Sequence, residues 1–346
     1  MNVEPDLTRY SRQILFGPIG AEGQRRLGQA HATLIGCGAL GSVLASTLIR
    51  AGVGHLRIVD RDFLELDNLQ RQILFDEQDL ADNLPKAEAA ARKLRRINSQ
   101  VEVEPAVADF NPSNAEWLCR DAGVLLDGTD NLETRYLIND VAVKHGIPWV
   151  YGACIAAEGR VLPILPRETP CLRCLWEEPL PPGALPTCET VGVLGPVVNI
   201  VASLQAVEAL KILTGRRDDL NPKLVTIDAW TGRIRQIEVG AAMVGGQCPC
   251  CKLGRFDFLA GGKVSATTAL CGRDAVQVLP PPGQRVDFAQ LAARLAGLGD
   301  VRYNAYLLRL RRGDYEIVLF PDGRAIIRGT SDPAVARSIF SKYVGL

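Results

Sequence analysis

The sequence predicts an α/β protein in which a large domain with a doubly wound, mixed β-sheet precedes a small C-terminal α+β domain. From residue 31 to residue 154, short apolar strands alternate with helix-forming segments. A hairpin pattern around Thr231–Gly232 adds antiparallel strands, which makes the sheet mixed. The segment 271–346 carries consecutive short strands between two amphipathic helices.

The strands of the large domain are predicted from short apolar runs that end at turns or acidic residues. They are expected at 31–35, 56–60, 101–107, 123–130 and 149–154. Helices are expected from the glycine-rich turn 36–41 to Ala51, at 85–97 and through Val143. Gly52 suits the left-handed position after a helix, and a turn at Gly146–Pro148 leads into the last strand.

The most hydrophobic stretch runs from Val191 to Leu213, and it predicts a buried core helix. A membrane span needs about 20 mostly uninterrupted apolar residues. Polar residues and a proline interrupt this stretch at Pro196, Asn199, Ser203, Gln205 and Glu208. We therefore expect no membrane-spanning segment here.

The domain boundaries are expected at 1–252 for the large domain, 253–270 for a linker and 271–346 for the small domain. In the small domain, 286–299 is an amphipathic helix, and 305–329 is a meander of three strands. The terminal helix begins with Asp332 as N-cap and Pro333 at its first position.

Composition excludes recognition by overall charge. Lys and Arg together number 39, and so do Asp and Glu, so no net field attracts nucleic acid or a membrane. The N-terminal "MNVEPDLTRYSRQ" lacks the apolar core of a signal peptide. We expect a cytoplasmic protein without a nucleic-acid or membrane partner.

A glycine-rich turn predicts a nucleotide site. "GCGALG", with Gly36, Gly38, Ala39 and Gly41, directly follows a strand and opens a helix. Such a turn lets the backbone approach phosphates at a helix N-terminus. Asp60 ends the next strand, where a carboxylate can bind ribose hydroxyls. The motif does not name the nucleotide, because an NAD-dependent oxidoreductase carries it too.

Charged and amide side chains at successive strand ends favour a triphosphate. Arg71 and Lys86 are predicted phosphate-binding cations, Asp130 a Mg²⁺ ligand, and Asn68 and Gln72 hydrogen-bonding groups. The carboxyl ends of parallel strands share one edge, so these segments can converge. A dinucleotide's pyrophosphate carries less charge. The combination therefore predicts a metal-bound nucleoside triphosphate and nucleotidyl transfer.

In this order, "RYSRQILF", "GCGALG", "VDRDFLELDNLQRQ", "PKAEAA" and "DGTDN" resemble the family that activates ubiquitin-like proteins, and most of all its ThiF/MoeB/HesA-type adenylyltransferases. The resemblance covers about residues 8–252. It implies that the nucleotide is Mg-ATP, and it implies a Rossmann-like fold that joins AMP to the C-terminal carboxylate of a small ubiquitin-fold sulfur-carrier protein ending in Gly-Gly. It also implies that this reaction releases pyrophosphate.

The resemblance also implies residue roles. Asp60 would bind the ribose, while Asn68, Arg71 and Lys86 would bind phosphates. Asp130 would bind Mg²⁺. The other residues expected to bind the nucleotide are Asp62, Gln72 and Asn131. Arg12 would reach the active site of a partner subunit, which implies a homodimer. Ala39 stands where many relatives have glycine, and we expect little consequence from this small residue.

The reaction needs no general base, because a carboxylate is already a nucleophile at neutral pH. The histidines, His31, His55 and His145, all lie outside the motifs. This argues against a histidine-dependent hydride transfer. A nucleotide-sensing scaffold without catalysis is a further alternative.

"CLRC" and "CPCC" form two C-x-x-C pairs, which predict a Cys₄ zinc site made by Cys171, Cys174, Cys248 and Cys251. Relatives carry the same pairs around a structural metal. A shifted ligand set that includes Cys250, and that leaves Cys248 or Cys251 free, stays open.

Cys188 stands alone after "EEPLPPGALPT" and before "GVLGP". In relatives this position lies on a loop near the adenylate, and some members form a thioester or acyl-persulfide there. A nucleophilic cysteine needs exposure and a lowered pKa. A covalent and a passive role both stay open.

The role of the small C-terminal domain is also open. It shows no cysteine-centred loop of the rhodanese type, and its ending "KYVGL" is not Gly-Gly. Recruitment of the carrier is one hypothesis for it.

Overall fold

The computed structural model describes residues 7–179, 188–244, 247–262, 267–269, 274–279 and 285–344. The chain forms two compact units. The first contains Met1–Pro186 and Gly192–Lys263, and the second contains Thr187–Val191 and Val264–Leu346. The predicted linker 253–270 lies partly outside the described residues, so the predicted domain boundaries stay a prediction.

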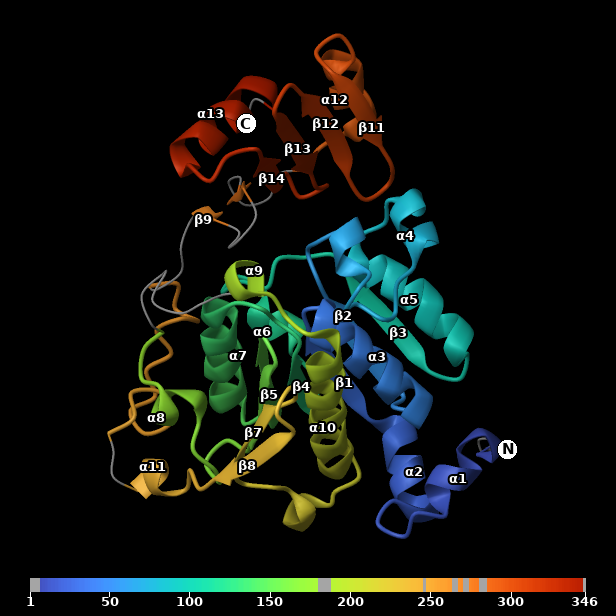
Figure 1. Ribbon diagram of the computed structural model, residues 1–346, viewed down its shortest axis with the longest axis vertical. Helices are drawn as coiled ribbons and strands as arrows, with labels where there is room; N and C mark the ends of the chain where they lie inside the picture. Colours follow the sequence, from blue (N-terminus) through green and yellow to red (C-terminus); the bar gives the residue numbers. More distant parts are fainter. Residues whose placement is uncertain are drawn as a thin grey trace. The chain divides into compact units, whose positions relative to one another are not determined.

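The first unit is built on an eight-stranded sheet in the order β3-β2-β1-β4-β5-β6-β7-β8 (Figure 1). The strands are β1 His31–Ile35, β2 His55–Val59, β3 Glu102–Ala106, β4 Val124–Asp127, β5 Trp149–Ile155, β6 Glu158–Ile164, β7 Leu224–Asp228 and β8 Arg233–Ile237. Strands β1 to β5 pair in parallel, and β6, β7 and β8 add antiparallel pairs. The predicted doubly wound, mixed sheet is confirmed.

Strand β6 was not predicted from the sequence. It pairs with β5 and β7, and Pro163 lies opposite Val150. Proline cannot donate a hydrogen bond to a neighbouring strand, so its presence argues against an interior strand in a sequence pattern. The pairing with β5 and β7 overrides this local signal.

Helices cover both faces of this sheet. The longer ones are α2 Gly20–Gln29, α3 Ala39–Ala51, α5 Lys86–Ile97, α7 Leu132–His145 and α10 Gly195–Leu213. Helix α10 contacts α3 and strands β4, β5 and β6, whereas α7 packs on the other face with a core that includes Leu125 and Trp149 (Figure 1). The shorter elements are η1 Thr8–Tyr10, α1 Ser11–Ile14, η2 Leu66–Asn68, α4 Glu77–Asp82, α6 Ala115–Leu118, α8 Leu172–Leu175, η3 Arg217–Asp219 and α11 Ala241–Val244.

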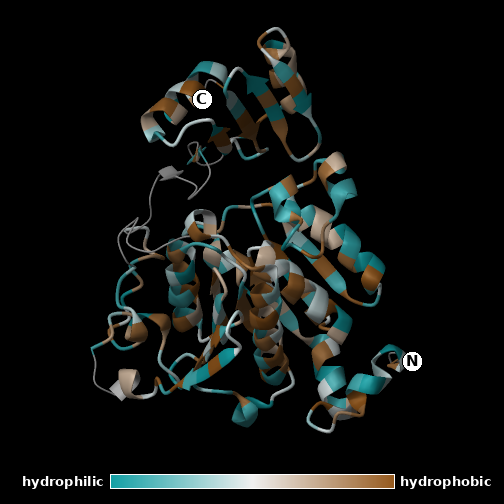
Figure 2. Ribbon diagram, in the orientation of Figure 1, coloured by the Kyte–Doolittle hydropathy of each residue, from teal (hydrophilic) through white to brown (hydrophobic). Residues whose placement is uncertain are grey.

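Helix α10 is the stretch predicted as a core helix. Among the described residues it is the one helix long and apolar enough to cross a membrane. Its contacts with the strands explain this hydrophobicity, and Figure 2 shows hydrophobic residues along α10 and the central strands. Burial of apolar surface against the sheet accounts for the composition without a membrane.

The second unit holds a six-stranded antiparallel sheet in the order β11-β12-β13-β14-β10-β9. The strands are β9 Thr267–Ala269, β10 Ala275–Val278, β11 Asp300–Tyr303, β12 Leu308–Arg312, β13 Tyr315–Leu319 and β14 Ala325–Arg328. The helices are α9 Cys188–Val191, α12 Phe288–Leu295 and α13 Pro333–Tyr343. The predicted meander is thus the centre of a larger sheet. The Asp332 side chain caps α13 by accepting hydrogen bonds from the Ala334 and Val335 backbone N–H groups.

Candidate active site

The glycine-rich turn lies at the carboxyl end of β1, where two close backbone approaches exclude side chains. Gly36 has φ +87°, and a Cβ there would lie 2.6 Å from the Gly128 carbonyl oxygen. A Cβ on Gly41 would lie 2.1 Å from the Gly36 oxygen. Helix α3 begins at Ala39 with Gly38 as N-cap, and no side chain caps it. Its first N–H groups and its dipole therefore form an anion-binding terminus.

The Asp60 carboxylate is held beside this turn by two backbone hydrogen bonds. The N–H of Cys37 donates to Oδ2 at 2.6 Å, and the N–H of Asp62 donates to Oδ1 at 2.7 Å. Burial raises the pKa of Asp60, and the nearby Lys86 ammonium opposes that rise. The carboxylate is thus fixed in direction, as a ribose-binding acid requires.

Lys86 supplies a buried positive charge at the same edge of the sheet. It begins α5 and is only 3% exposed. Its backbone N–H donates to the Asp62 carbonyl at 2.8 Å, and its Nζ lies 3.7 Å from Asp62 Oδ2. The cation is therefore positioned between the end of β2 and the start of α5.

The segment 67–72 lies against the phosphate turn. Asn68 is fully buried, and Arg71 donates to the Asp67 carbonyl at 2.7 Å. The Gln72 Nε2 lies 3.8 Å from the position that a Cβ on Gly38 would occupy. Gln72 Oε1 is buried and has no hydrogen-bond partner among the described residues. A buried amide with unused hydrogen-bonding capacity beside the turn fits a site that a ligand completes.

Asp130 and Asn131 join β4 to α7. Asp130 is exposed, and its charge acts on Arg61 at the end of β2 and on Arg135 in α7. Asn131 is the N-cap of α7, and its side chain accepts from the Thr134 N–H at 2.8 Å. The ends of β1, β2 and β4 therefore converge, as predicted.

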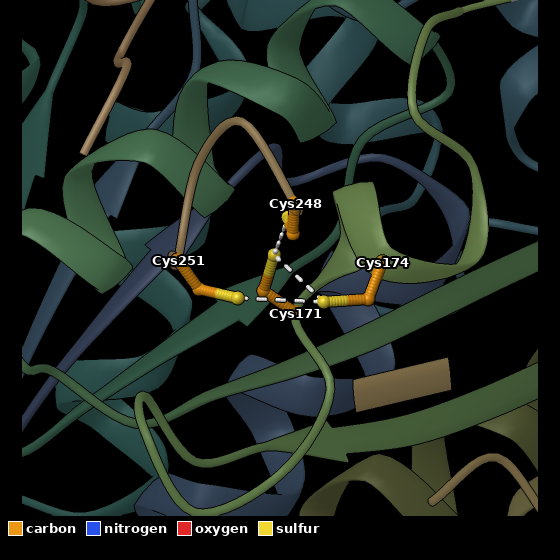
Figure 3. A group of neighbouring side chains, drawn as sticks. All are labelled: Cys171, Cys174, Cys248 and Cys251. Atoms are coloured by element: carbon orange, nitrogen blue, oxygen red, sulfur yellow. Dashed lines mark hydrogen bonds between the residues drawn. The ribbon is translucent and has the colours of Figure 1, made fainter. Parts of the chain in front are cut away.

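The four predicted metal-binding cysteines meet in one cluster (Figure 3). The sulfur atoms of Cys171, Cys174, Cys248 and Cys251 all lie within 4.8 Å of one another. Cys171 Sγ lies 3.8 Å from Cys174 Sγ and 3.6 Å from Cys248 Sγ. Four converging thiols form a donor set for a metal ion.

Arg12 lies away from the phosphate turn of its own chain. In α1, Gln13 Nε2 donates to the carbonyl of Ala51, the last residue of α3, at 2.9 Å. Just before α1, Arg9 donates to the carbonyl of Ile97, the last residue of α5, at 3.1 Å. The phosphate turn and Lys86 lie at the opposite ends of these helices. At 1.5 Å per residue, the length of α3 alone separates them by about 18 Å.

Cys188 is the first residue of α9 and is half-buried. Residues 188–191 belong to the second unit. The stretch 180–187 before it lies outside the described residues. Its predicted approach to the adenylate stays a prediction.

Comparison with known proteins assigns the family. The model of the ThiF family matches residues 10–250. The chain belongs to the ThiF family. It is 44% identical over 338 residues to the sulfur carrier protein ThiS adenylyltransferase of Bacillus subtilis, covering 97% of this chain and 99% of that protein.

Two further similarities were found. The SAMP-activating enzyme E1 of Haloferax volcanii is 39% identical over 253 residues, 73% of this chain and 92% of that protein. The crystal structure of E. coli MccB with ATP matches with a TM-score of 0.58 and 23% identity, covering 70% of this chain and 73% of that one. At this identity the MccB likeness supports the fold alone.

The predicted family and the predicted enzyme class, an adenylyltransferase, are confirmed. The named relatives are an adenylyltransferase and an activating enzyme, which favours nucleotidyl transfer over the NAD-dependent oxidoreductase alternative.

Sequence analysis missed Arg135, which holds the loop that carries Asp130. Arg135 Nε donates to Asp127 Oδ2 at 3.0 Å, and Nη2 donates to the Thr129 carbonyl at 2.8 Å. Although burial disfavours its charge, the Asp127 carboxylate holds the pKa of Arg135 above its ordinary value. The sequence of α7 gave no signal for this role, because the partner Asp127 comes from the end of β4.

Proposed function

We propose that this protein uses Mg-ATP to adenylate the C-terminal glycine carboxylate of a small ubiquitin-fold sulfur-carrier protein that ends in Gly-Gly. The observation that carries the proposal is a buried cation, a fixed carboxylate and a glycine-rich helix N-terminus at one sheet edge, in a chain similar along its length to a ThiS adenylyltransferase. That similarity favours a thiamin-type carrier. Molybdopterin and tRNA-thiolation carriers are the other candidates.

The residues fit ATP as a substrate. Asp60 would bind the ribose, with Asp62 and Asn131 near the nucleoside. The phosphates would be bound by the turn made by Gly36, Gly38, Ala39 and Gly41. The side chains that would bind them together with this turn are Asn68, Arg71, Gln72 and Lys86. The buried amide of Gln72 and the uncapped start of α3 support this assignment, because both offer polar groups that lack a partner side chain. Asp130 would hold the Mg²⁺ ion, which would help to neutralise the charge of the phosphates.

The reaction proceeds by direct displacement. A carboxylate oxygen of the carrier attacks the α-phosphorus, the bond to the β-phosphate breaks, and pyrophosphate leaves with its electron pair. No proton moves, so the site must mainly position the reactants and neutralise charge. Lys86 and the N-terminus of α3 supply fixed positive charge for this purpose.

We also propose a homodimer in which Arg12 completes the partner's active site. The support is the place of α1 at the far ends of α3 and α5 from its own phosphate turn. Next to Arg12, Leu15 and Phe16 are 74% and 60% exposed. Large apolar side chains at this exposure favour a protein contact.

Zinc is the metal proposed for the cysteine cluster. A tetrahedral zinc with sulfur ligands at about 2.3 Å requires sulfur–sulfur distances of about 3.8 Å. The Cys171–Cys174, Cys171–Cys248 and Cys174–Cys251 distances are 3.8, 3.6 and 3.4 Å. The site would be structural, since four thiolates leave no open position. A second, covalent step at Cys188 and a cytoplasmic location stay predictions.

Exchange of labelled pyrophosphate into ATP tests the main proposal. We expect exchange only with a carrier that retains its Gly-Gly ending, and we expect Asp130→Ala to abolish it. Normal exchange in Asp130→Ala would refute the site assignment, and exchange with no carrier protein would refute the proposed substrate. For the dimer, mixed Arg12→Ala and Asp130→Ala subunits should recover activity that neither variant has alone.

A further inference from the structure

Helix α7 carries a fully buried amide that contacts both cysteine loops. Asn139 is 0% exposed. Its Oδ1 accepts a hydrogen bond from the Leu172 backbone N–H at 2.8 Å. Its Nδ2 donates to Cys250 Sγ at 3.3 Å. Leu172 lies between Cys171 and Cys174, and Cys250 lies between Cys248 and Cys251, so one side chain joins the two halves of the cluster.

The next residue on α7 anchors the chain that leaves the second loop. Asp140 is also 0% exposed. Its Oδ2 accepts from the Phe258 N–H at 2.9 Å and from the Leu259 N–H at 3.3 Å. Consecutive residues of one helix thus hold the second cysteine loop and the segment that follows it.

Within each loop, backbone hydrogen bonds connect only near neighbours. Cys174 N–H donates to the Cys171 carbonyl at 3.0 Å, and Leu253 N–H donates to the Cys248 carbonyl at 3.1 Å. Besides Asn139, Arg173 of the first loop reaches the chain just after the second loop, because its Nη1 donates to the Arg255 carbonyl at 3.2 Å. The backbone bonds shape each loop but cannot set the distance between the two. That distance decides whether four sulfurs can share one metal ion.

Cys250 has a different environment from the four clustered cysteines. It is 1% exposed, and its sulfur receives the Asn139 amide hydrogen and interacts with Asp140 and Cys171, but it does not belong to the group of four mutually close sulfurs. A sulfur held in this way lies in the layer around the ligands. Groups in that layer orient metal ligands, and their loss weakens metal binding by about 10- to 100-fold.

We propose that Asn139 is a positioning residue for the metal site, in which its buried amide holds Leu172 of the first cysteine loop and Cys250 of the second at the spacing that four-sulfur coordination requires. Metal retention then depends on α7 as well as on the four thiolates. The inference rests on the proposed zinc site, and it assigns Cys250 a place outside the ligand set.

The test measures zinc release from the full-length protein into a chromophoric chelator, together with the zinc content of the purified protein. Asn139→Leu keeps a similar volume and removes both hydrogen bonds, and we expect zinc release to be about 10- to 100-fold faster. Cys250→Ala removes the bond from Asn139 to sulfur, with the contacts of that sulfur to Cys171 and Asp140, but keeps the bond from Leu172 to Asn139, so we expect a smaller acceleration. Cys250→Ala should also retain one zinc per chain.

A matched control separates positioning from general loss of stability. Val141→Ala alters the same helix at a residue that is 0% exposed and packs in the core. The two variants are compared at denaturant concentrations that give them the same unfolding free energy. Under these conditions Val141→Ala should release zinc more slowly than Asn139→Leu. Cobalt substitution supplies a second readout, because the absorption of a four-thiolate Co²⁺ site should persist in Cys250→Ala.

Three results would overturn the proposal. Asn139→Leu could release zinc at the wild-type rate. It could also release zinc no faster than Val141→Ala when both are compared at the same unfolding free energy. Cys250→Ala could lose the zinc or the four-thiolate cobalt spectrum, which would make Cys250 a ligand. If Asn139→Leu does not fold, Cys250→Ala still decides, since unchanged zinc release from it would show that the Asn139–Cys250 bond does not position the site.

Discussion

Arg135→Met should destabilise the first unit strongly, because it leaves a buried carboxylate without its cation. Asp127 is 0% exposed, and its Oδ2 accepts from Arg135 Nε at 3.0 Å. The substitution also removes the donors to the Thr129 carbonyl at 2.8 Å and the Gly152 carbonyl at 3.2 Å. Methionine fills much of the same volume but offers no donor.

The magnitude follows from the cost of an uncompensated buried charge, which is about 3–5 kcal/mol. Asp127 Oδ1 keeps its hydrogen bonds from Thr129, at 2.9 Å from the N–H and 2.7 Å from Oγ1, so we expect the lower half of that range. For a unit of this size, each kcal/mol corresponds to about 2–4 °C in Tm. A loss of about 3–4 kcal/mol would therefore lower Tm by roughly 6–16 °C.

Urea denaturation followed by circular dichroism measures this loss, and a double-mutant cycle assigns it. Asp127→Asn combined with Arg135→Met removes both charges, so the double variant should lose less stability than the two single losses added together. Additive losses, or an Arg135→Met protein within about 0.5 kcal/mol of wild type, would refute the reasoning from a buried ion pair.

Three further predictions concern other parts of the molecule. Gly41→Ala should weaken ATP binding by about tenfold or more in calorimetry, because its Cβ would lie 2.1 Å from the Gly36 carbonyl oxygen; unchanged affinity would show that the turn can shift. Cys188→Ala should keep carrier-dependent pyrophosphate exchange, since adenylation needs no thiol; loss of exchange in a folded variant would contradict this. Although burial opposes it, Arg57 holds the pKa of Glu104 below its ordinary value. The stability that this pair contributes is present above that ordinary pKa and is lost as pH falls through the lowered one. Wild type and Glu104→Gln should therefore differ in unfolding free energy near pH 7 and converge in acid.

Much of the site could be predicted from the sequence because its signals are local. The run 31–41 contains the strand, the turn and the start of the helix, and their geometry follows from neighbouring residues. The C-x-x-C spacing likewise brings two thiols together within each loop before any tertiary contact forms. The strand–helix alternation determined the doubly wound sheet by the same logic, since each element buries one face.

Tertiary structure alone decided which polar groups are buried and what they contact. Nothing within the helix sequence distinguishes Arg135 and Asn139 from exposed residues, because their partners Asp127 and Cys250 come from a strand end and a distant loop. Strand β6 forms despite Pro163 because two neighbours pair with it. The sequence thus determined local conformation and the type of chemistry. Which side chains are buried, and which partners they contact, depends on packing between segments far apart in the chain. Local sequence patterns do not show this packing.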